Sequence, residues 1–413
     1  MKSRFNASLL VLFLIAQSVC AQADGVAGAV RFSFGHDRPG FVPVAGTNLI
    51  SNAGDFGFEP GAMVSAGDDC LTADNPFLFS VKLPEGNYAV RVGFRGLDKN
   101  SDVTVKAEMR RLMLENISVA PGETLSRAFI VNVRTPTISG GDRVRLKKRE
   151  LETEMVAWDE KLTLEFNGTR PSVGWLEIVS TNVPTVFLAG DSTVCDQPSE
   201  PWNSWGQMLT RFFKPDIAVA NYANSGESIK SSLGARRFEK VFSLMKPGDW
   251  LLVQFGHNDM KDKATNALEV YEANLRSIVA RTREKGGTPV LITSMERKAG
   301  IEKPTLAGYP DTVRKVAAEE KASLIDLNSM SIVFYRALGT NLSLAFQDGT
   351  HHNNYGSYQL ARCVVEGIRK NVPALARHLA DDAGVFDPAK PDDPLTFNIP
   401  ASPSHSSSKP EGN

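Results

Sequence analysis

Four short polar segments of this 413-residue sequence carry side chains that together could hydrolyse an ester. They are Gly190-Asp-Ser-Thr193, Asn224-Ser-Gly-Glu-Ser228, Gly256-His-Asn-Asp259 and Asp348-Gly-Thr-His-His352. Ser192 in the first segment has a hydroxyl that becomes a good nucleophile only beside a base of near-neutral pKa. His351 is a base of that type, and Asp348, three residues earlier, can orient its imidazole and stabilise the imidazolium.

Attack on an ester creates an oxyanion, and the same segments offer hydrogen-bond donors for it. The candidates are the backbone N–H groups of Ser192 and Gly226 and the side-chain amide of Asn258. Each such donor contributes about 3 kcal/mol to stabilising the transition state when its geometry is right. The helix expected after Ser192 adds positive potential from its N-terminus. The pattern therefore predicts a serine nucleophile that transfers an acyl group.

Each segment also has an ordinary structural explanation when it is taken alone. The Gly-Asp-Ser triplet can cap a helix that follows a strand, and Gly226 can serve a tight turn. The Gly256–Asp259 segment can be a polar loop, and Asp348 with His351 can cap the last helix. The chemical interpretation therefore depends on whether the fold brings the four segments to one place.

Beyond about residue 184, apolar runs of strand length alternate with helical stretches. The runs expected to form strands are Thr185–Gly190, Ile217–Ala220, Trp250–Phe255, Pro289–Thr293 and Leu324–Leu327. Continuously apolar runs are typical of parallel strands buried on both faces, and strand and helix alternate five times. We therefore expect an α/β fold with a doubly wound sheet of five parallel strands. Ligands bind at the carboxyl ends of such strands, and all four polar segments lie at that end.

The half of the chain before residue 183 has a different period. Its apolar and polar residues alternate over short runs separated by turn residues, namely Phe77–Leu83, Tyr88–Phe94, Val103–Met109, Phe129–Arg134 and Leu162–Phe166. No helical stripe of apolar residues lies between them. This pattern predicts an all-β domain, an antiparallel sandwich of two sheets whose inner faces form the core.

The first 23 residues have the features of a secretory signal peptide. Lys2 and Arg4 precede an apolar run, 7–16, that is too short to span a bilayer, and Ala21-Gln-Ala23 has the small-x-small form of a cleavage site. We expect cleavage near Ala23 and export to the periplasm or the cell exterior. The expected order is a signal peptide (1–23), a β-sandwich domain (24–182), a hydrolase domain (184–378) and an extended Pro- and Ser-rich tail (379–413).

The composition excludes several classes of partner. The chain has 46 Lys and Arg against 47 Asp and Glu, so its net charge of −1 gives no general attraction to nucleic acid or anionic membranes. We expect no nucleic-acid partner and no membrane anchor. Cys70, Cys195 and Cys363 remain after cleavage and show no metal-ligand spacing; one disulfide among them and three buried thiols are both compatible with the sequence. We expect no metal and no cofactor.

In this order, the four polar segments resemble the four blocks of the SGNH (GDSL-type) hydrolases. Details of the segments resemble the bacterial rhamnogalacturonan acetylesterases within that family: Gly190-Asp-Ser-Thr-Val194, Trp202-x-x-Trp205-Gly206, Gln254-Phe-Gly-His-Asn-Asp259 and Asp348-x-Thr-His351. The resemblance covers about residues 184 to 375. The first half of the chain is similar to the galactose-binding-like β-sandwich of some bacterial pectin esterases, notably at Leu162–Gly168.

The resemblance implies a flavodoxin-like sheet and ester hydrolysis without a metal. It assigns Ser192 as nucleophile, His351 rather than His352 as base, and Asp348 as the residue that orients the base. It also implies that the oxyanion donors are the three groups named above. His257 and Glu227 are weaker candidates for substrate binding. The family often has arginine after the glycine of the second block, and Glu227 stands there in this chain.

Together with the expected signal peptide, the resemblance implies an exported serine esterase that removes acetyl groups from an acetylated plant cell-wall polysaccharide or oligosaccharide, specifically pectic rhamnogalacturonan. Two alternatives remain open at this stage. One is an SGNH lipase, thioesterase or acetylxylan esterase with the same catalytic groups. The other is a carbohydrate-binding protein without catalytic activity.

Overall fold

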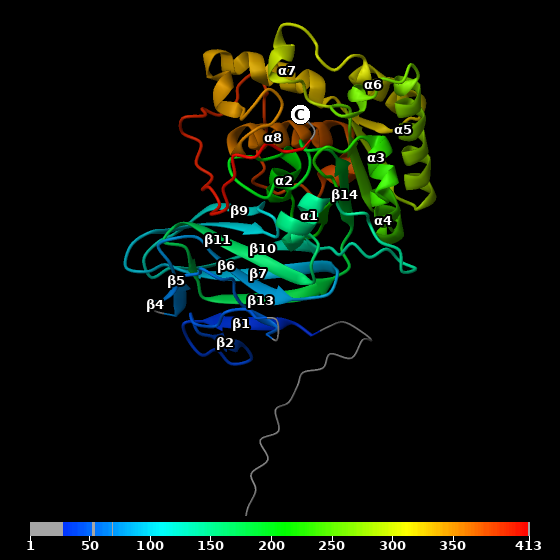
Figure 1. Ribbon diagram of the computed structural model, residues 1–413. Helices are drawn as coiled ribbons and strands as arrows, with labels where there is room; N and C mark the ends of the chain where they lie inside the picture. The colour runs from blue at the N-terminus through cyan, green and yellow to red at the C-terminus, as the bar shows by residue number, and fades with distance from the viewer. Residues whose placement is uncertain (1–27, 52–53, 68, 412–413) are drawn as a thin grey trace, which may run out of the picture.

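A computed structural model describes residues 28–51, 54–67 and 69–411. They form a β-rich N-terminal region and an α/β region that lie in contact. Figure 1 shows the β-rich N-terminal region below and the helix-covered sheet above. The expected signal peptide, 1–23, lies outside the described residues. Within them, no helix is both long and apolar enough to cross a membrane.

The N-terminal region is β-rich, as predicted. One sheet has the order β10 (Thr124–Val133), β7 (Gly86–Arg95), β13 (Trp175–Thr181), β1 (Val30–Phe34) and β2 (Val42–Val44). The second has the order β3 (Phe56–Phe58), β6 (Phe77–Lys82), β11 (Lys161–Thr169), β8 (Ser101–Ala107) and β9 (Arg111–Val119). Neighbouring strands are antiparallel except β1 and β2, which are parallel. A small third sheet joins β12 (Ser172–Val173), β5 (Cys70–Thr72) and β4 (Ser65–Gly67).

Phenylalanine rings fill the space between the two larger sheets. On β6, Phe77 and Phe79 point to the same face and are separated by the less buried Leu78. The ring of Phe79 meets the edge of Phe34 from β1, with 5.2 Å between the ring centroids. Both rings are fully buried, so their contact joins the inner faces of the two sheets.

The short helix α1 (Lys148–Thr153) was not predicted, because its sequence has no apolar stripe. It is followed by the single 3₁₀ turn η1 (Met155–Ala157). Tertiary contacts hold α1 in place. The buried Glu150 carboxylate accepts hydrogen bonds from the Lys147 N–H at 2.8 Å, from Trp158 Nε1 at 3.0 Å and from Arg237 Nη2 at 2.6 Å.

The α/β half contains the predicted sheet of five parallel strands. Its order is β15 (Ala218–Asn221), β14 (Thr185–Gly190), β16 (Trp250–Gln254), β17 (Thr288–Ile292) and β18 (Ser323–Ile325). The helices are α2 (Trp205–Leu209), α3 (Ile229–Gly234), α4 (Arg237–Leu244), α5 (Ala267–Glu284), α6 (Tyr309–Glu319), α7 (Leu327–Leu338), α8 (Asn354–Asn371) and α9 (Pro373–Ala376). Both the strand order and the direction match the expected doubly wound fold.

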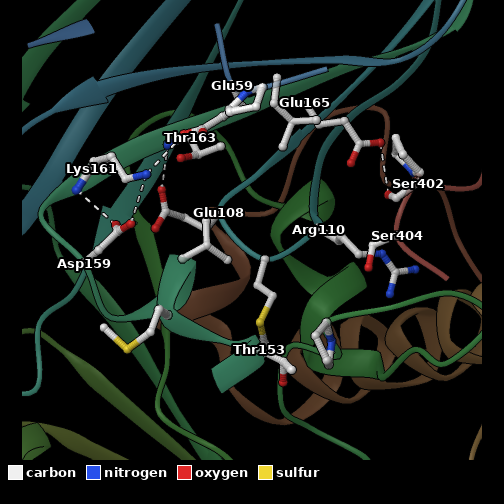
Figure 2. Close-up of a pocket in the computed structure, with 17 residues that line it drawn as sticks. Glu59, Glu108, Arg110, Thr153, Asp159, Lys161, Thr163, Glu165, Ser402 and Ser404 are labelled. Atoms are coloured by element: carbon white, nitrogen blue, oxygen red, sulfur yellow. Dashed lines mark hydrogen bonds and ion pairs between the residues drawn. The ribbon is translucent and has the colours of Figure 1, made fainter. Parts of the chain in front are cut away.

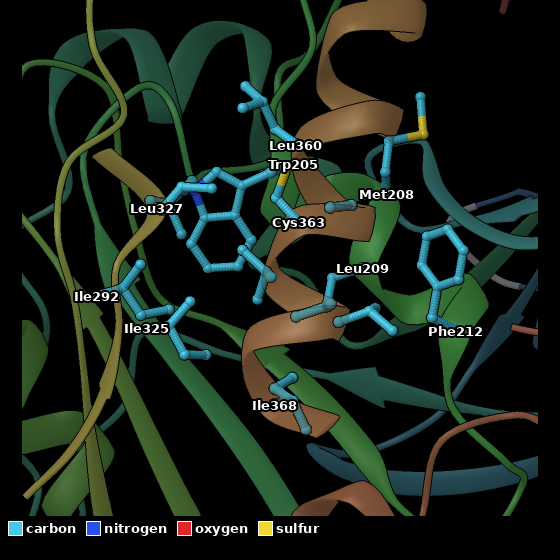
Figure 3. Packing of buried hydrophobic residues seen from close by; sticks show 14 of the residues in the cluster. Trp205, Met208, Leu209, Phe212, Ile292, Ile325, Leu327, Leu360, Cys363 and Ile368 are labelled. Atoms are coloured by element: carbon cyan, nitrogen blue, oxygen red, sulfur yellow. The ribbon is translucent and has the colours of Figure 1, made fainter. Parts of the chain in front are cut away.

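Each face of this sheet has its own hydrophobic core, because successive strand residues point to opposite faces. On β14, Val186 and Leu188 pack into the core under α2, α7 and α8, whereas Phe187 and Ala189 pack into the core under α3 to α6. Figure 3 shows the first core, with Trp205 of α2 beside Leu360 of α8. Burial on both faces explains why the strand sequences are continuously apolar.

Strand β9 joins the sandwich to the α/β half. Leu112 on β9 is buried in the core under α2 and α8. The backbone next to it is also bound, since Gln207 Nε2 of α2 donates to Met109 O at 2.7 Å and Thr210 Oγ1 donates to Leu112 O at 2.5 Å. The edge of one domain therefore completes the hydrophobic core of the other.

The described part of the C-terminal segment, 377–411, has no helix or strand but is bound to both halves. Lys106 Nζ of the sandwich donates to Pro400 O and to Ser402 Oγ, each at 2.7 Å. Trp202 Nε1 of the α/β half donates to Ser406 O at 3.0 Å. Figure 1 shows this red segment running from the α/β half to the upper edge of the sandwich.

A cavity of about 510 Å³ lies where the sandwich, α1 and the C-terminal segment meet. Figure 2 shows Glu108, Asp159 and Lys161 on one side of it and Glu165 with Ser402 on the other. Burial raises the pKa of Glu108 to about 8, although the charge of Arg111 and a hydrogen bond from the Thr163 N–H act in the opposite direction. Glu108 is therefore held as a neutral acid at pH 7.

This raised pKa predicts how the stability of the protein changes with pH. An unfolded Glu108 ionises near its ordinary pKa of 4.5 and the folded one near 8, so folding takes up a proton between these values. Stability is lost as the pH rises through that window. Glu108→Gln has no carboxyl to ionise and should not lose stability in this way. The difference in melting temperature between the variant and the wild type should be several degrees larger at pH 8.5 than at pH 5, which corresponds to a change of a few kcal/mol in the free energy of unfolding.

Glu165→Gln is the matched control for this prediction. Glu165 is equally buried but lies 3.6 Å from Lys106 Nζ, so neutralising it leaves a buried ammonium with one fewer partner. This variant should melt at a lower temperature at both pH values. Equal shifts for Glu108→Gln at pH 5 and pH 8.5, measured by calorimetry, would contradict the assignment of a neutral Glu108.

Candidate active site

Ser192 lies in a tight turn between β14 and α2 that is fixed by the neighbouring Asp191. One Asp191 oxygen accepts the Thr193 N–H at 2.9 Å and the Thr193 hydroxyl at 2.6 Å. The helix approaches this turn closely, since a Cβ on Gly206 would lie 2.1 Å from Val194 O. Glycine at 206 therefore lets α2 pack directly against the turn.

The other Asp191 oxygen binds the segment after β16. It lies 3.2 Å from His257 Nδ1, and His257 Nε2 lies 3.0 Å from Met295 O after β17. Burial opposes ionisation of Asp191, but the charge and hydrogen bond of His257 and the two bonds from Thr193 outweigh it and lower the pKa of the carboxyl. Both ring nitrogens of His257 therefore contact protein groups in the loops around the site.

The structure brings the three residues of the expected triad together. Ser192 Oγ lies 2.8 Å from His351 Nε2, and His351 Nδ1 lies 2.9 Å from Asp348 Oδ2. The other oxygen, Asp348 Oδ1, accepts the N–H groups of Thr350 and His351, each at 2.7 Å. Burial raises the pKa of Asp348, but these hydrogen bonds and the charge of His351 more than reverse the effect and hold the pKa well below its ordinary value.

This geometry is the arrangement that a serine nucleophile requires. An ionised Asp348 accepts the Nδ1–H of His351 and so fixes the tautomer in which Nε2 accepts the Ser192 proton. The same carboxylate could stabilise an imidazolium formed by proton transfer from the serine. Ser192 and His351 are only 3% and 1% exposed, so such a transfer would meet little competing water.

His352 occupies a different environment from its neighbour. Its ring stacks on Tyr335 and lies 4.1 Å from the ring of Phe346, centroid to centroid, and its Nε2 lies 3.0 Å from Tyr335 Oη. Burial lowers the pKa of His352 to about 3. The ring is therefore a neutral part of the core rather than a second base.

The segment that carries Gly226 lies directly beside the nucleophile turn. Gln197 Nε2 donates to Ser192 O at 2.7 Å and lies 3.4 Å from Ser225 Oγ. Gly226 has φ +75°, a conformation that favours glycine. Within the described part of the chain, neither the Ser192 N–H nor the Gly226 N–H has a hydrogen-bond acceptor, which leaves both groups available for an oxyanion.

Asn258 is oriented by contacts on both sides of its amide. Lys261 Nζ donates to Asn258 Oδ1 at 3.0 Å, which places the NH₂ group on the opposite side, and Asn258 Nδ2 donates to Glu227 O at 3.1 Å. The second N–H of that amide remains for another acceptor. Asn258 thus lies against the Gly226 segment, as an oxyanion donor must.

Glu227 is buried and its carboxylate is bound within the protein. Oε1 lies 3.1 Å from Lys147 Nζ and 3.7 Å from Arg237 Nε, and Oε2 accepts a hydrogen bond from Ser231 Oγ. The residue is 1% exposed. Its carboxylate therefore neutralises two cations beside the site.

Two residues at the site were not identified as functional from the sequence. The ring of Trp202 meets the edge of the His351 imidazole at a centroid distance of 5.9 Å and restricts its movement. Arg111 of β9 donates from Nε to Asp196 Oδ2 at 2.8 Å. Asp196 is the fourth residue after Ser192. A sequence signal existed for Trp202, which begins the Trp-x-x-Trp pattern, whereas Arg111 follows Arg110 and has no comparable signal.

The three cysteines among the described residues are all buried. Cys195 and Cys363 are buried thiols, and burial raises the pKa of Cys195 to about 12. Cys70 is buried in the sandwich. Among the described residues, no group of three or more His, Cys, Asp or Glu side chains could hold a metal ion.

Comparison with known proteins identifies related sequences. Residues 188–358 match the GDSL-like Lipase/Acylhydrolase family. Rhamnogalacturonan acetylesterase RhgT of Bacillus subtilis (strain 168) is 34% identical over 48% of this chain and 95% of its own. The probable rhamnogalacturonan acetylesterase YesY of the same strain is 33% identical over 45% of this chain and 92% of its own.

A third relative extends beyond the α/β half. The uncharacterized esterase YxiM of Bacillus subtilis is 25% identical over 82% of this chain and 90% of its own. Its solved structure covers 83% of this chain and 98% of its own, with 23% identity and a TM-score of 0.45.

The two adjacent histidines should respond differently to substitution. His351→Ala removes the base and should lower kcat/KM for p-nitrophenyl acetate by about a thousandfold or more. His352→Ala leaves a cavity against Tyr335 and Phe346, so it should lower stability by about 2–4 kcal/mol and keep most activity well below its melting temperature. Kinetics and thermal denaturation of both variants test this, and the opposite ranking of activities would place the base one residue away.

The buried pair of Arg111 and Asp196 should control both stability and activity. Arg111→Met leaves Asp196 buried with a single cation, Arg134, at 3.7 Å, and should lower the free energy of unfolding by about 3–5 kcal/mol. It should also lower kcat, because Asp196 fixes the loop after Ser192. Arg31→Met, which removes an ion pair whose arginine is 43% exposed, is the control and should change stability by less than about 1 kcal/mol. Urea denaturation that gives equal losses for the two variants would contradict this role.

Proposed function

Because the chain belongs to the GDSL-like lipase/acylhydrolase family, we propose that it is a serine esterase that removes acetyl groups from a pectic polysaccharide, rhamnogalacturonan. The observation that carries the chemistry is the continuous arrangement of Ser192, His351 and Asp348 at 2.8 and 2.9 Å. The names of the two relatives above 30% identity support the choice of substrate.

In the first half-reaction, His351 Nε2 takes the Ser192 proton while Oγ attacks the acetyl carbonyl. The negative charge develops on the carbonyl oxygen, where the N–H groups of Ser192 and Gly226 and the Asn258 amide can donate to it. When the intermediate collapses, the bond between the acetyl carbon and the sugar oxygen breaks, and protonated His351 gives its proton to that oxygen. The sugar departs with a free hydroxyl, and acetyl-Ser192 remains. Asp348 keeps the imidazole oriented throughout.

In the second half-reaction, water replaces the sugar. His351 takes a proton from the water, the resulting hydroxide attacks acetyl-Ser192, and the same donors bind the second oxyanion. Collapse of the intermediate releases acetate and returns the proton to Ser192. The signal peptide expected at residues 1–23 supports the proposal, since export would bring the enzyme to the polysaccharide.

Substitution of Ser192 tests the proposed mechanism. Ser192→Ala should remain folded and lose activity on p-nitrophenyl acetate by several orders of magnitude, because only binding and the oxyanion donors remain. Ser199→Ala changes a serine in the following loop that contacts Ser404 and should retain activity. Mass spectrometry after an acid quench should find one acetyl group on the wild-type peptide that contains Ser192 and none on the Ser192→Ala peptide. Acetylation at another residue, or an active Ser192→Ala, would remove this mechanism.

The substrate is tested separately by measuring acetate release. Acetylated rhamnogalacturonan, acetylated xylan and a lipid ester are compared at equal ester concentration. The proposal expects the highest kcat/KM on rhamnogalacturonan, because contacts remote from the acetyl group add to transition-state binding. A preference for xylan or for the lipid ester would replace the substrate but keep the mechanism.

A further inference from the structure

A lysine from outside the α/β half lies over the glycine of the expected oxyanion hole. Lys147, just before α1, donates from Nζ to Ser225 O at 2.6 Å. A Cβ built on Gly226 would lie 3.2 Å from that Nζ. The side chain of Lys147 is 28% exposed, so it is only partly enclosed by protein.

The position of Lys147 is fixed by its own backbone and by a buried carboxylate. Its N–H donates to Glu150 Oε2 at 2.8 Å, and Glu150 is itself fully buried. Its Nζ lies 3.1 Å from Glu227 Oε1. Glu227 also has Arg237 as a partner, so Lys147 is not the sole cation that compensates this acid. The ammonium is therefore held at the site before any ligand arrives.

The third direction of the ammonium is occupied by a carboxylate from the C-terminal segment. Glu411 Oε2 lies 3.4 Å from Lys147 Nζ, and the Glu411 side chain is 47% exposed. A Cβ on Gly226 would also lie 3.2 Å from Glu411 Cβ. A half-exposed ion pair at this distance contributes little stability, so another carboxylate can displace Glu411.

We propose that Lys147 is a specificity-determining residue that binds the carboxylate of an acidic sugar near the acetylated position. This inference rests on the proposed function and assigns a residue of this chain to the uronic acid that rhamnogalacturonan contains. In the protein without substrate, the Glu411 carboxylate occupies the position beside Lys147 that the sugar carboxylate would take. Lys147 supplies a cation from the N-terminal region to the loop that carries Gly226.

The experiment compares two forms of one substrate. Acetylated rhamnogalacturonan oligosaccharides are used with free carboxylates and as their methyl esters, which have the same sugars and acetyl groups without the charge. The measured quantity is the ratio of kcat/KM for the acid to kcat/KM for the methyl ester. For the wild type this ratio should be about ten, which is the factor that one charge-assisted hydrogen bond gives.

Lys147→Gln should reduce this ratio to about one, through KM for the acid form, and Lys147→Arg should restore most of it. Lys148→Gln is the matched control, since Lys148 is the next residue and its side chain is 86% exposed beside Glu152; its ratio should equal that of the wild type. Glu411→Gln removes the competing carboxylate and should raise the ratio.

A ratio that stays at its wild-type value in Lys147→Gln overturns the proposal, even where overall activity falls, because a residue that only holds the loop affects both substrates alike. Binding offers a second measurement that does not require turnover. In a Ser192→Ala background, Lys147→Gln should raise the dissociation constant for the acid oligosaccharide about tenfold. An unchanged dissociation constant also overturns the proposal.

Failure of the proposed function has a different signature. If the wild type hydrolyses p-nitrophenyl acetate and acetylated xylan but neither form of rhamnogalacturonan, the pectic substrate and the role of Lys147 are both wrong, while the esterase mechanism stands. If the wild type hydrolyses both forms of rhamnogalacturonan equally, the pectic substrate stands and the role of Lys147 alone is wrong.

Discussion

The buried ion pair between Arg111 and Asp196 is the interaction on which the arrangement of the active site depends. The two side chains are 2% and 0% exposed, 2.8 Å apart, and they belong to different halves of the molecule. Charges removed from water are tolerated only in a geometry that supplies further partners. Asn132 O accepts from Arg111 Nη1 at 3.0 Å, and Asn221 Nδ2 donates to Asp196 Oδ1 at 2.9 Å. The loop after Ser192 is thereby fixed to the sandwich.

From this pair, polar contacts extend across the carboxyl ends of four neighbouring strands. Asn221 at the end of β15 also donates to Val194 O at 2.8 Å, beside the nucleophile turn that follows β14. Gln254 at the end of β16 donates to Thr193 Oγ1 at 2.7 Å, and Asp191 reaches the segment after β17 through His257. Because each contact uses a buried group, a change at one would leave another without a partner. The turn that presents Ser192 is rigid for this reason.

The sequence predicted the parts of the structure that depend on local pattern. Strand β14 was predicted at its observed bounds because Thr185 is followed by five apolar residues, and all six are buried. The spacing of Trp202, Trp205, Leu209 and Phe212 is typical of one helix, whereas α2 covers only Trp205–Leu209 and a 3₁₀ turn, Thr210–Phe212, follows it. The difference has a physical cause, since Trp202 lies outside the helix with its ring against His351. Helix α1 was missed because its sequence has no apolar stripe, and one partner that holds its Glu150, Arg237, lies 87 residues away in the sequence.

The candidate triad was predictable from motif spacing, whereas the electrostatic surroundings of the oxyanion donors were not. A carboxylate at position 227, next to Gly226, would oppose negative charge that develops on the substrate oxygen. Glu227 is compatible with that chemistry because Lys147 and Arg237 lie beside it. Lys147 comes from the segment between β10 and β11 of the N-terminal region, and Arg237 from α4. The N-terminal region therefore contributes to the charge balance of the site, and a boundary near residue 183 divides the sequence pattern more cleanly than it divides the chemistry.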